Sequence, residues 1–372
     1  MSNTTTANFQ TIPTLDYSLT ANPESKAQFI SQLRSVIINV GFLYLSNTPV
    51  DKALISTLKD DYIPRLFALP QEDKDRIRMV NSPHFLGYSR MGMELTKGEV
   101  DWREQFDFGT GCEEEKPLKD GEPEYWNVYG PSQYPSETQL PGFKALFETY
   151  LAQVSALAAD FLRLVSEAVG LPPETLDQFY KTENRTMHLS KIVKYPVQGQ
   201  SKQGVGAHYD GSMLTFLLQA SEEHRGLQAQ NLRGEWIDVP PKPDTFVVNF
   251  GRSLEFVTQG VVRATSHRVL APPLDSKTPR YSVPFFYSGM DLEVRVDSNA
   301  LKMPSEILKL RDERGVLPET ESINYPEYAH DVAGKVYLLG RAKSHPDVAE
   351  RHYPDVFKAL FPNGMPLHGV AY

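Results

Sequence analysis

Apolar positions in the first half of the chain recur mainly at helical spacing. The clearest case lies in residues 141–184, where large apolar residues follow one another every three or four positions: Phe143, Phe147, Tyr150, Val154, Leu157, Phe161 and Leu164. Gly170 and Pro172 can end this helix. We also expect helices within 22–41 and 54–69, and an irregular loop system from 79 to 141.

After Met187 the hydrophobic period changes to two, which is typical of strands. Six segments show it, with turn residues between them: LSKIVKYP, SMLTFLLQ, LQAQNLRGEWIDVP, TFVVNFG, SHRVLAPP and RYSVPFFY. Short strands separated by Gly and Pro turns predict a sandwich or barrel rather than a parallel sheet. Helical spacing returns in PSEILKLRDERG and HPDVAERHYPDVFKALF.

These patterns predict one enzyme-sized unit in four parts. Residues 1–140 form an N-terminal region of helices, strands and a substrate loop, 141–184 a long helix packed on the core, and 185–295 the β-rich core. The C-terminal helices in 296–372 are a candidate lid over a pocket. Their aromatic residues at every fourth position fit plain docking on the core equally well: Tyr353, Phe357 and Phe361.

Composition narrows the class of protein. A formal charge of −9 disfavours nucleic acid or an anionic membrane as a partner, since both carry negative charge. No apolar stretch reaches the length of a membrane span, and the first residues lack the features of a secretory signal. Cys112 is the only cysteine and cannot form an internal disulfide, which favours a reducing compartment. We therefore expect a cytoplasmic protein. We also expect a monomer or weak homo-oligomer that takes a small-molecule substrate.

The segment GVGAHYDGSMLTFLL contains the motif H-x-D, as His208 and Asp210. Residues two apart on an extended chain point to the same side, so this pair can bind one ion. A motif this short also arises by chance beside a turn. The chain contains a second copy, His345 and Asp347, at a predicted helix start where the aspartate would cap backbone N–H groups.

A third ligand would turn the first pair into a metal site. His267, 57 residues after Asp210, heads another strand-like segment. Two histidines and one carboxylate leave positions open on the metal, as in non-haem Fe(II) oxygenases, although zinc accepts the same ligands. Arg280 and Ser282 share one face of the next strand and offer a guanidinium fork and a hydroxyl to a carboxylate. An internal ion pair is the alternative role for Arg280.

Together these motifs resemble those of the isopenicillin N synthase-like branch of the 2-oxoglutarate/Fe(II)-dependent dioxygenases. Segments similar to that branch extend over most of the chain: VGFLYLSNTPV, LFALPQEDK, GYSRMGMELTKGEVDWREQFDFG, VKYP and TFVVNFGRSLEFVTQGVVRATSHRV. The resemblance implies a mainly β fold, a distorted double-stranded β-helix or cupin-like jelly roll, flanked by helices.

The resemblance also implies roles for individual residues. The iron ligands would be His208, Asp210 and His267. The residues that hold the carboxylate of 2-oxoglutarate remote from its keto group would be Arg280, Ser282 and Tyr195. Val193 and Lys194 depart from the branch's NYYPP pattern, so an Asn contact to the cosubstrate is missing.

The implied reaction couples oxidative decarboxylation of 2-oxoglutarate, to succinate and CO2, with hydroxylation, desaturation or cyclisation of a small organic substrate such as a natural product. Fe(II), 2-oxoglutarate and O2 take part, with ascorbate as a candidate stimulant. Two alternatives stay open: an Fe(II) oxidase of the same fold that needs no 2-oxoglutarate, and a non-catalytic jelly-roll binding protein. The candidate substrate-pocket residues are Met91, Glu94, Phe106 and Phe286.

Overall fold

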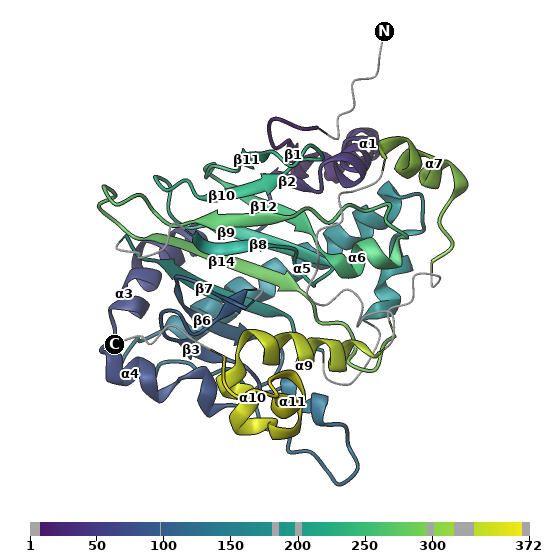
Figure 1. Cartoon of the computed structure of the whole chain (residues 1–372). Coiled ribbons are helices and arrows are strands. Elements are labelled where there is room, and N and C mark those ends of the chain that lie inside the picture. The colour runs from purple at the N-terminus through teal and green to yellow at the C-terminus, as the bar shows by residue number, and fades with distance from the viewer. Residues whose placement is uncertain are drawn as a thin grey trace.

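Two β-sheets form the centre of the molecule (Figure 1). The computed structural model describes residues 8–96, 98–180, 186–197, 203–295, 301–315 and 331–366. In this part of the chain the major sheet has eight strands, in the order β1-β2-β12-β9-β14-β7-β6-β3, and the minor sheet has four, in the order β11-β10-β13-β8. The jelly-roll fold predicted from the sequence is confirmed.

From β7 onward the chain passes back and forth between the two sheets. The strands of the major sheet are β1 Thr14–Asp16, β2 Phe42–Ser46, β3 Gly87–Ser89, β6 Glu104–Gly109, β7 Leu189–Tyr195, β9 Leu214–Gln219, β12 Thr245–Phe250 and β14 Arg280–Tyr287. Those of the minor sheet are β8 Gln203–His208, β10 Leu227–Gln230, β11 Trp236–Asp238 and β13 His267–Leu270. A separate pair consists of β4 Leu95–Thr96 and β5 Glu99–Val100.

Strands from the N-terminal region complete the major sheet at both edges. β1 and β2 join next to β12, while β6 and β3 join next to β7. The region 79–141, which we expected to be a loop system, therefore contains strands. Every residue of β6 from Glu104 to Phe108 is buried, so this strand lacks the alternation that marks a strand with one exposed face.

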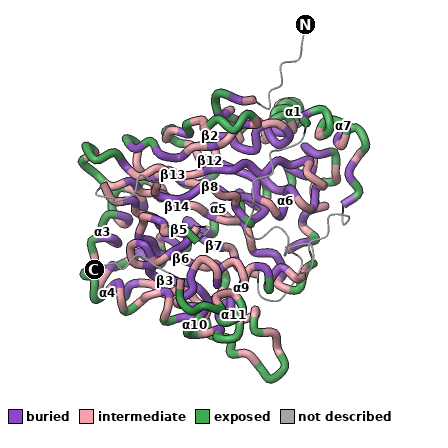
Figure 2. Tube along the Cα trace, viewed as in Figure 1, coloured by how far each residue is buried: buried purple, intermediate pink, exposed green. Residues whose placement is uncertain are grey.

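Helices cover the sheets on the outside, and Figure 2 shows buried residues concentrated on the strands. The helices are α1 Pro23–Asn39, α2 Lys52–Thr57, α3 Ile63–Ala68, α4 Gln71–Arg76, α5 Phe143–Ala168, α6 Arg252–Val257, α7 Ser305–Arg314, α9 Ala333–Ser344, α10 Pro346–His352 and α11 Pro354–Leu360. The predicted helix within 54–69 contains a π-helical turn, Leu58–Tyr62, just before Pro64, whose missing N–H and ring disturb regular α-helical bonding.

The long helix α5 packs its apolar stripe against the major sheet. It contacts β9 and β14, and the rings of Phe161 and Phe216 meet edge to face with centroids 5.7 Å apart. Phe216 belongs to the face of β9 turned toward α5. The neighbouring residues Thr215 and Leu217 point to the other face, where they line a cavity. The major sheet thus has one face for the core and one for a site.

The C-terminal helices divide into a cavity wall and a docked unit. α9, which the sequence did not predict, contacts β4 and lines the large cavity described below. α10 and α11 instead dock through a separate apolar cluster, in which the ring of Tyr353 stacks on Phe85 with centroids 5.5 Å apart. Of the two roles considered for Tyr353 and Phe357, docking on the core is the one observed. No helix of the described residues is long and apolar enough to cross a membrane.

Candidate iron centre and substrate cavity

His208 and His267 face each other across the minor sheet. Strands β8 and β13 are antiparallel, and His267 stands directly opposite His208 in their register. Directly opposed residues bring their side chains close together, and the two imidazole rings have centroids 4.3 Å apart. The pairing of the two strands therefore explains how residues distant in sequence reach one point.

Asp210 completes the group from the turn after β8. Its Oδ1 lies 3.7 Å from Nε2 of His208 and 3.6 Å from Nε2 of His267. Candidate ligand atoms of the three residues lie within 4.8 Å of one another. In the part of the chain that the structure describes, no other three His, Cys, Asp or Glu side chains gather in this way, so the second H-x-D copy, which includes His345, belongs to no such group.

Backbone carbonyls orient both imidazoles toward this point. Nδ1 of His208 lies 2.8 Å from the Gly206 carbonyl oxygen, and Nδ1 of His267 lies 3.1 Å from that of Thr265. A carbonyl can only accept, so each Nδ1 donates and each Nε2 keeps its lone pair for a metal. Burial, reinforced by His267, lowers the pKa of His208 to about 4, so its imidazole is neutral at pH 7 and competent as a ligand.

Two side chains hold the carboxylate of Asp210 in place. Its Oδ2 accepts hydrogen bonds from Thr215 Oγ1 at 2.6 Å and from Asn249 Nδ2 at 2.7 Å, which leaves Oδ1 turned toward the histidines. Burial alone would raise the pKa of Asp210, but the neighbouring imidazoles and these two hydrogen bonds lower it below its ordinary value. The aspartate is thus ionised, and its Oδ1 is oriented toward the two histidines.

Arg280 is a buried cation with spare hydrogen-bond donors. It is 1% exposed, stands opposite Tyr195 in the β14–β7 register, and has its guanidinium 5.0 Å from the centre of that ring. Nη2 is 3.4 Å from Gln219 Oε1, while Nη1 has no hydrogen-bond partner. No ion pair links it to any carboxylate of the described residues. Burial lowers the pKa of Arg280, because an unpaired buried charge is costly, and a bound anion would remove that cost.

A small cavity of about 70 Å³ joins Arg280 to the three clustered side chains. Among the residues that line it are His208, Asp210, His267, Tyr195, Arg280 and Ser282. Gly204 gives Tyr195 its room, since a Cβ at Gly204 would lie 2.7 Å from the ring. Two nitrogen ligands and one oxygen ligand with open positions fit Fe(II), and the unpaired guanidinium fits the far carboxylate of a small diacid.

Comparison with known proteins identifies the family. Residues 12–137 match the model of the non-haem dioxygenase in morphine synthesis N-terminal family, and residues 184–289 match the 2OG-Fe(II) oxygenase superfamily. The chain is 41% identical over 367 residues to the 2-oxoglutarate-dependent dioxygenase frbJ of Dothideomycetidae sp., which covers 95% of each protein. The chain belongs to the 2-oxoglutarate/Fe(II)-dependent oxygenases.

Two further relatives are informative. The oxygenase is 28% identical over 340 residues to the homoarginine-6-hydroxylase 2-ODD-233 of Oryza sativa, covering 87% of this chain and 96% of that protein. Its fold is similar to that of a full-length Neurospora crassa protein solved in complex with alpha-KG, with a TM-score of 0.65 at 23% identity over 88% of this chain and 96% of that one. Ferrous iron, 2-oxoglutarate and O2 are the cofactor, cosubstrate and oxidant of the family, as the sequence predicted.

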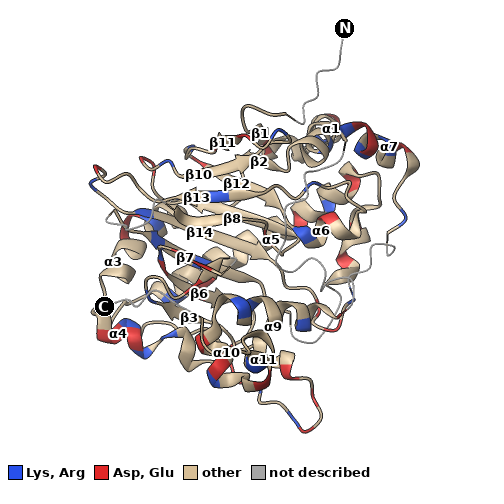
Figure 3. Ribbon diagram, viewed as in Figure 1, with Lys and Arg blue, Asp and Glu red and all other residues tan. Residues whose placement is uncertain are grey.

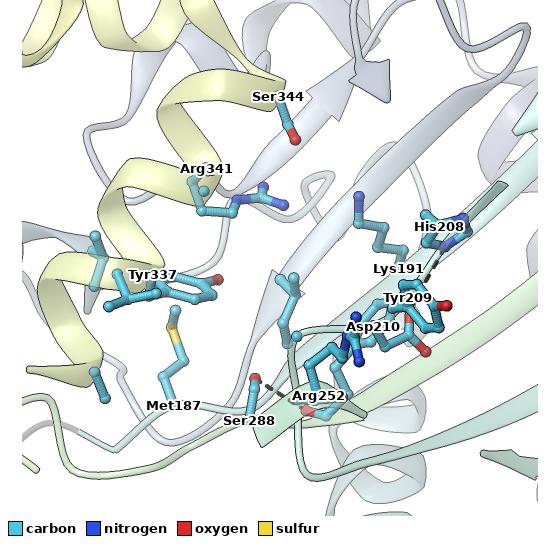
Figure 4. Close-up of a pocket in the computed structure, with 18 of the residues that line it drawn as sticks. Met187, Lys191, His208, Tyr209, Asp210, Arg252, Ser288, Tyr337, Arg341 and Ser344 are labelled. Atoms are coloured by element: carbon cyan, nitrogen blue, oxygen red, sulfur yellow. Dashed lines mark hydrogen bonds and ion pairs between the residues drawn. The ribbon is translucent and has the colours of Figure 1, made fainter. Parts of the chain in front are cut away.

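A second, larger cavity of about 270 Å³ opens from the same group of side chains. Five residues line both cavities: Arg103, Val205, His208, Asp210 and Phe286. Figure 4 shows α9 on the opposite side of the large cavity from His208 and Asp210, with Arg341 and Tyr337 directed between them. A small molecule in this cavity would have one end next to the metal centre of the oxygenase.

The predicted pocket residues differ in where they lie. Glu94 and Phe286 line the large cavity. Met91 is not among the lining residues, and Phe106 is fully buried on the other face of β6, where its ring packs on Tyr88 with centroids 4.9 Å apart. Phe106 therefore does not line the cavity, and neither does its neighbour Asp107.

Several polar residues of the large cavity were missed from the sequence: Lys191, Arg252, Tyr337, Arg341 and Ser344. Lys191 could have been recognised as a buried polar residue, because a charged residue inside the apolar segment LSKIVKYP needs a buried partner of opposite charge. Its partner stands directly opposite on β6, where Asp107 pairs with Lys191 in the register. Figure 3 shows charged residues on β6 and β7 in the interior, beside the more numerous ones on the outer helices.

Proposed function

We propose that His208, Asp210 and His267 bind Fe(II), and that Arg280, Ser282 and Tyr195 hold the remote carboxylate of 2-oxoglutarate. One observation carries the proposal. The small cavity is lined both by the three candidate ligands and by Arg280, whose Nη1 has no hydrogen-bond partner, and a metal and a cation in one cavity would suit a short diacid such as 2-oxoglutarate.

The residues of the chain would position the reactants. Iron supplies the site at which O2 oxidises 2-oxoglutarate and the substrate. Arg280 would fix the cosubstrate at its far end, while Thr215 and Asn249 keep the Asp210 carboxylate turned toward the histidines. Val205 and Phe286 line the junction of the two cavities and would exclude water between cosubstrate and substrate.

The substrate would be a small organic molecule that is hydroxylated, desaturated or cyclised in the large cavity. The rice relative is named for the amino acid homoarginine. The relatives from Dictyostelium are named 1-aminocyclopropane-1-carboxylate oxidase, and the compound in that name is an amino acid too. These names support testing amino acids first. The size of the cavity, about 270 Å³, suits molecules of that size.

Two measurements test the proposed function. Saturating 2-oxoglutarate, added under nitrogen to the Fe(II)-loaded protein, should raise the melting temperature; at 100 times its Kd the gain is about 2.7 kcal/mol. In air, product and succinate should then form in a ratio of one to one. Oxygen uptake without succinate, in a protein that 2-oxoglutarate does not stabilise, would instead identify the 2-oxoglutarate-independent oxidase.

We also propose a cytoplasmic monomer or weak homo-oligomer without nucleic-acid or membrane partners, because the chain carries a net charge of −9 and a single cysteine. The division into 1–140, 141–184, 185–295 and 296–372 also stays a proposal. The ranges of the two family matches, 12–137 and 184–289, support its first and third parts.

A further inference from the structure

One face of α9 forms a polar wall of the large cavity. Six residues of the helix line the cavity, each three or four positions from another of the set: Ala333, Val336, Tyr337, Gly340, Arg341 and Ser344. This spacing places them on one side of the helix. Figure 4 shows Arg341 extending from α9 toward Lys191, which rises from the sheet on the other side. Ser344, one turn after Arg341, adds a hydroxyl to the same wall.

The guanidinium of Arg341 uses only one of its three nitrogens within the protein. The residue is 7% exposed, and its Nη2 donates to the Phe85 carbonyl at 2.7 Å and to Asp107 Oδ2 at 2.8 Å. Nε is buried without a hydrogen-bond partner, and Nη1 makes no hydrogen bond with a described residue. The two N–H groups of Nη1 are therefore left for a ligand in the cavity that Arg341 lines.

Arg341 belongs to a buried chain of three cations and three carboxylates. Its members, in order of contact, are Asp101, Arg103, Glu94, Lys191, Asp107 and Arg341. Asp101 and Asp107 are fully buried and do not line the cavity, so the acids that balance the cations lie mostly behind the wall.

The members of this chain that line the cavity therefore carry more positive than negative charge. Of the chain's members, Arg103, Lys191, Arg341 and Glu94 line the cavity. Glu94 is already engaged: its oxygens lie 2.7 and 3.0 Å from Nζ of Lys191, and one is 2.7 Å from Arg103. Burial opposes ionisation of Glu94, but Arg103 and Lys191 hold its pKa well below the ordinary value, so it is a fixed anion without a need for a further cation.

We propose that the substrate carries a carboxylate, and that Arg341 binds it together with Ser344 and Lys191. The inference rests on the proposed function, because it takes the large cavity to be the substrate site. A planar carboxylate matches the fork of the guanidinium, which keeps free donors on Nη1 after Nη2 has paired with Asp107. The rest of the wall is largely apolar and suits a hydrocarbon body: Val128, Met187, Leu189, Met290, Leu292 and Val336.

A panel of matched compounds tests the substrate class. Small amino acids and small simple carboxylic acids, each paired with its primary amide, are incubated with the Fe(II)-loaded oxygenase, 2-oxoglutarate and air, and succinate release is measured above the rate without substrate. We expect stimulation by one or more acids, and a kcat/KM at least about 30-fold lower for the amide, since the amide loses a charge-assisted pair. Stimulation by amino acids or by simple carboxylic acids shows which of these two classes supplies the carboxylate.

Arg341→Lys tests the residue itself. Lysine keeps a cation for Asp107 but removes the planar fork with its free Nη1, so the KM for the acid should rise about 30-fold or more. The KM for 2-oxoglutarate and its effect on the melting temperature should change less than about twofold, a split that general loss of structure would not produce. The matched control is Arg351→Lys, because Arg351 is exposed on α10 and does not line the cavity.

Two results would overturn the inference while leaving the proposed function intact. One is a 2-oxoglutarate-stabilised enzyme that is stimulated equally by an acid and its amide, or by no acid in the panel. The other is an unchanged KM for the acid in Arg341→Lys. If 2-oxoglutarate neither stabilises the protein nor yields succinate, the proposed function itself fails.

Discussion

Replacing Asp210 by alanine is expected to abolish turnover. Asp210 supplies the one carboxylate of the candidate metal group, and its Oδ1 lies within 3.7 Å of both histidine Nε2 atoms. A metal contributes several kcal/mol of transition-state stabilisation, so succinate formation should fall about 1000-fold or more. The measurement is succinate released per enzyme with Fe(II) and 2-oxoglutarate in excess.

The same variant should remain folded. Removing the carboxylate leaves Asn249 Nδ2 without its acceptor, a cost of about 1–3 kcal/mol, whereas Thr215 can donate to Ser212 instead, and a buried charge is removed as well. The control is Asp238→Ala in β11, at the opposite edge of the minor sheet from β8, where the carboxylate is exposed and accepts a hydrogen bond from Gln228. Wild-type turnover by a folded Asp210→Ala variant would mean that the aspartate is no ligand.

Arg280→Gln is expected to weaken the binding of 2-oxoglutarate far more than it slows turnover at saturation. Glutamine keeps part of the side chain but lacks the charge and the fork. The loss of a buried charge pair costs about 2–5 kcal/mol, so the KM for 2-oxoglutarate should rise about 30-fold or more. Steady-state kinetics with varied 2-oxoglutarate give this number directly.

The ligand-free stability of Arg280→Gln separates a binding role from a structural one. If the role of Arg280 is to bind an anion, removing its unpaired buried charge should leave the melting temperature of the ligand-free protein unchanged or raise it. If it were half of an internal ion pair, its loss would destabilise the fold by about 3–5 kcal/mol. Arg268→Gln on β13 is the matched control, since Arg268 is a strand arginine whose guanidinium lies over Trp236, away from both cavities.

Strand parity allowed much of the site to be anticipated from the sequence. Arg280, Ser282 and Phe286 are separated by even numbers of residues, and all three line the small cavity. The relation between His208 and His267 is different, because their approach depends on the register of β8 and β13, which no local pattern encodes. The resemblance to known oxygenases supplied that pairing, and the fold and cofactors followed with it.

The polar wall of the large cavity depends on contacts between distant segments and was not foreseen. Arg341 comes from a helix near the C-terminus, Asp107 from an edge-proximal strand, and the two meet at 2.8 Å. Nothing in the local sequence of either residue indicates the other. On β6 the burial of both faces also removes the alternation that would indicate a strand, which is why this segment was expected to be a loop and Phe106 was expected in the pocket.

Anaerobic titration with Fe(II) tests most directly whether three distant side chains form one iron site. We expect the wild type to bind one ferrous ion per chain, and Asp210→Ala and His267→Ala to lose this site while remaining folded. His345→Ala, which alters the other H-x-D copy, should still bind one ion, because His345 stands apart from the clustered ligands. Stoichiometric iron in both Asp210→Ala and His267→Ala, or its loss in a folded His345→Ala, would contradict the assignment.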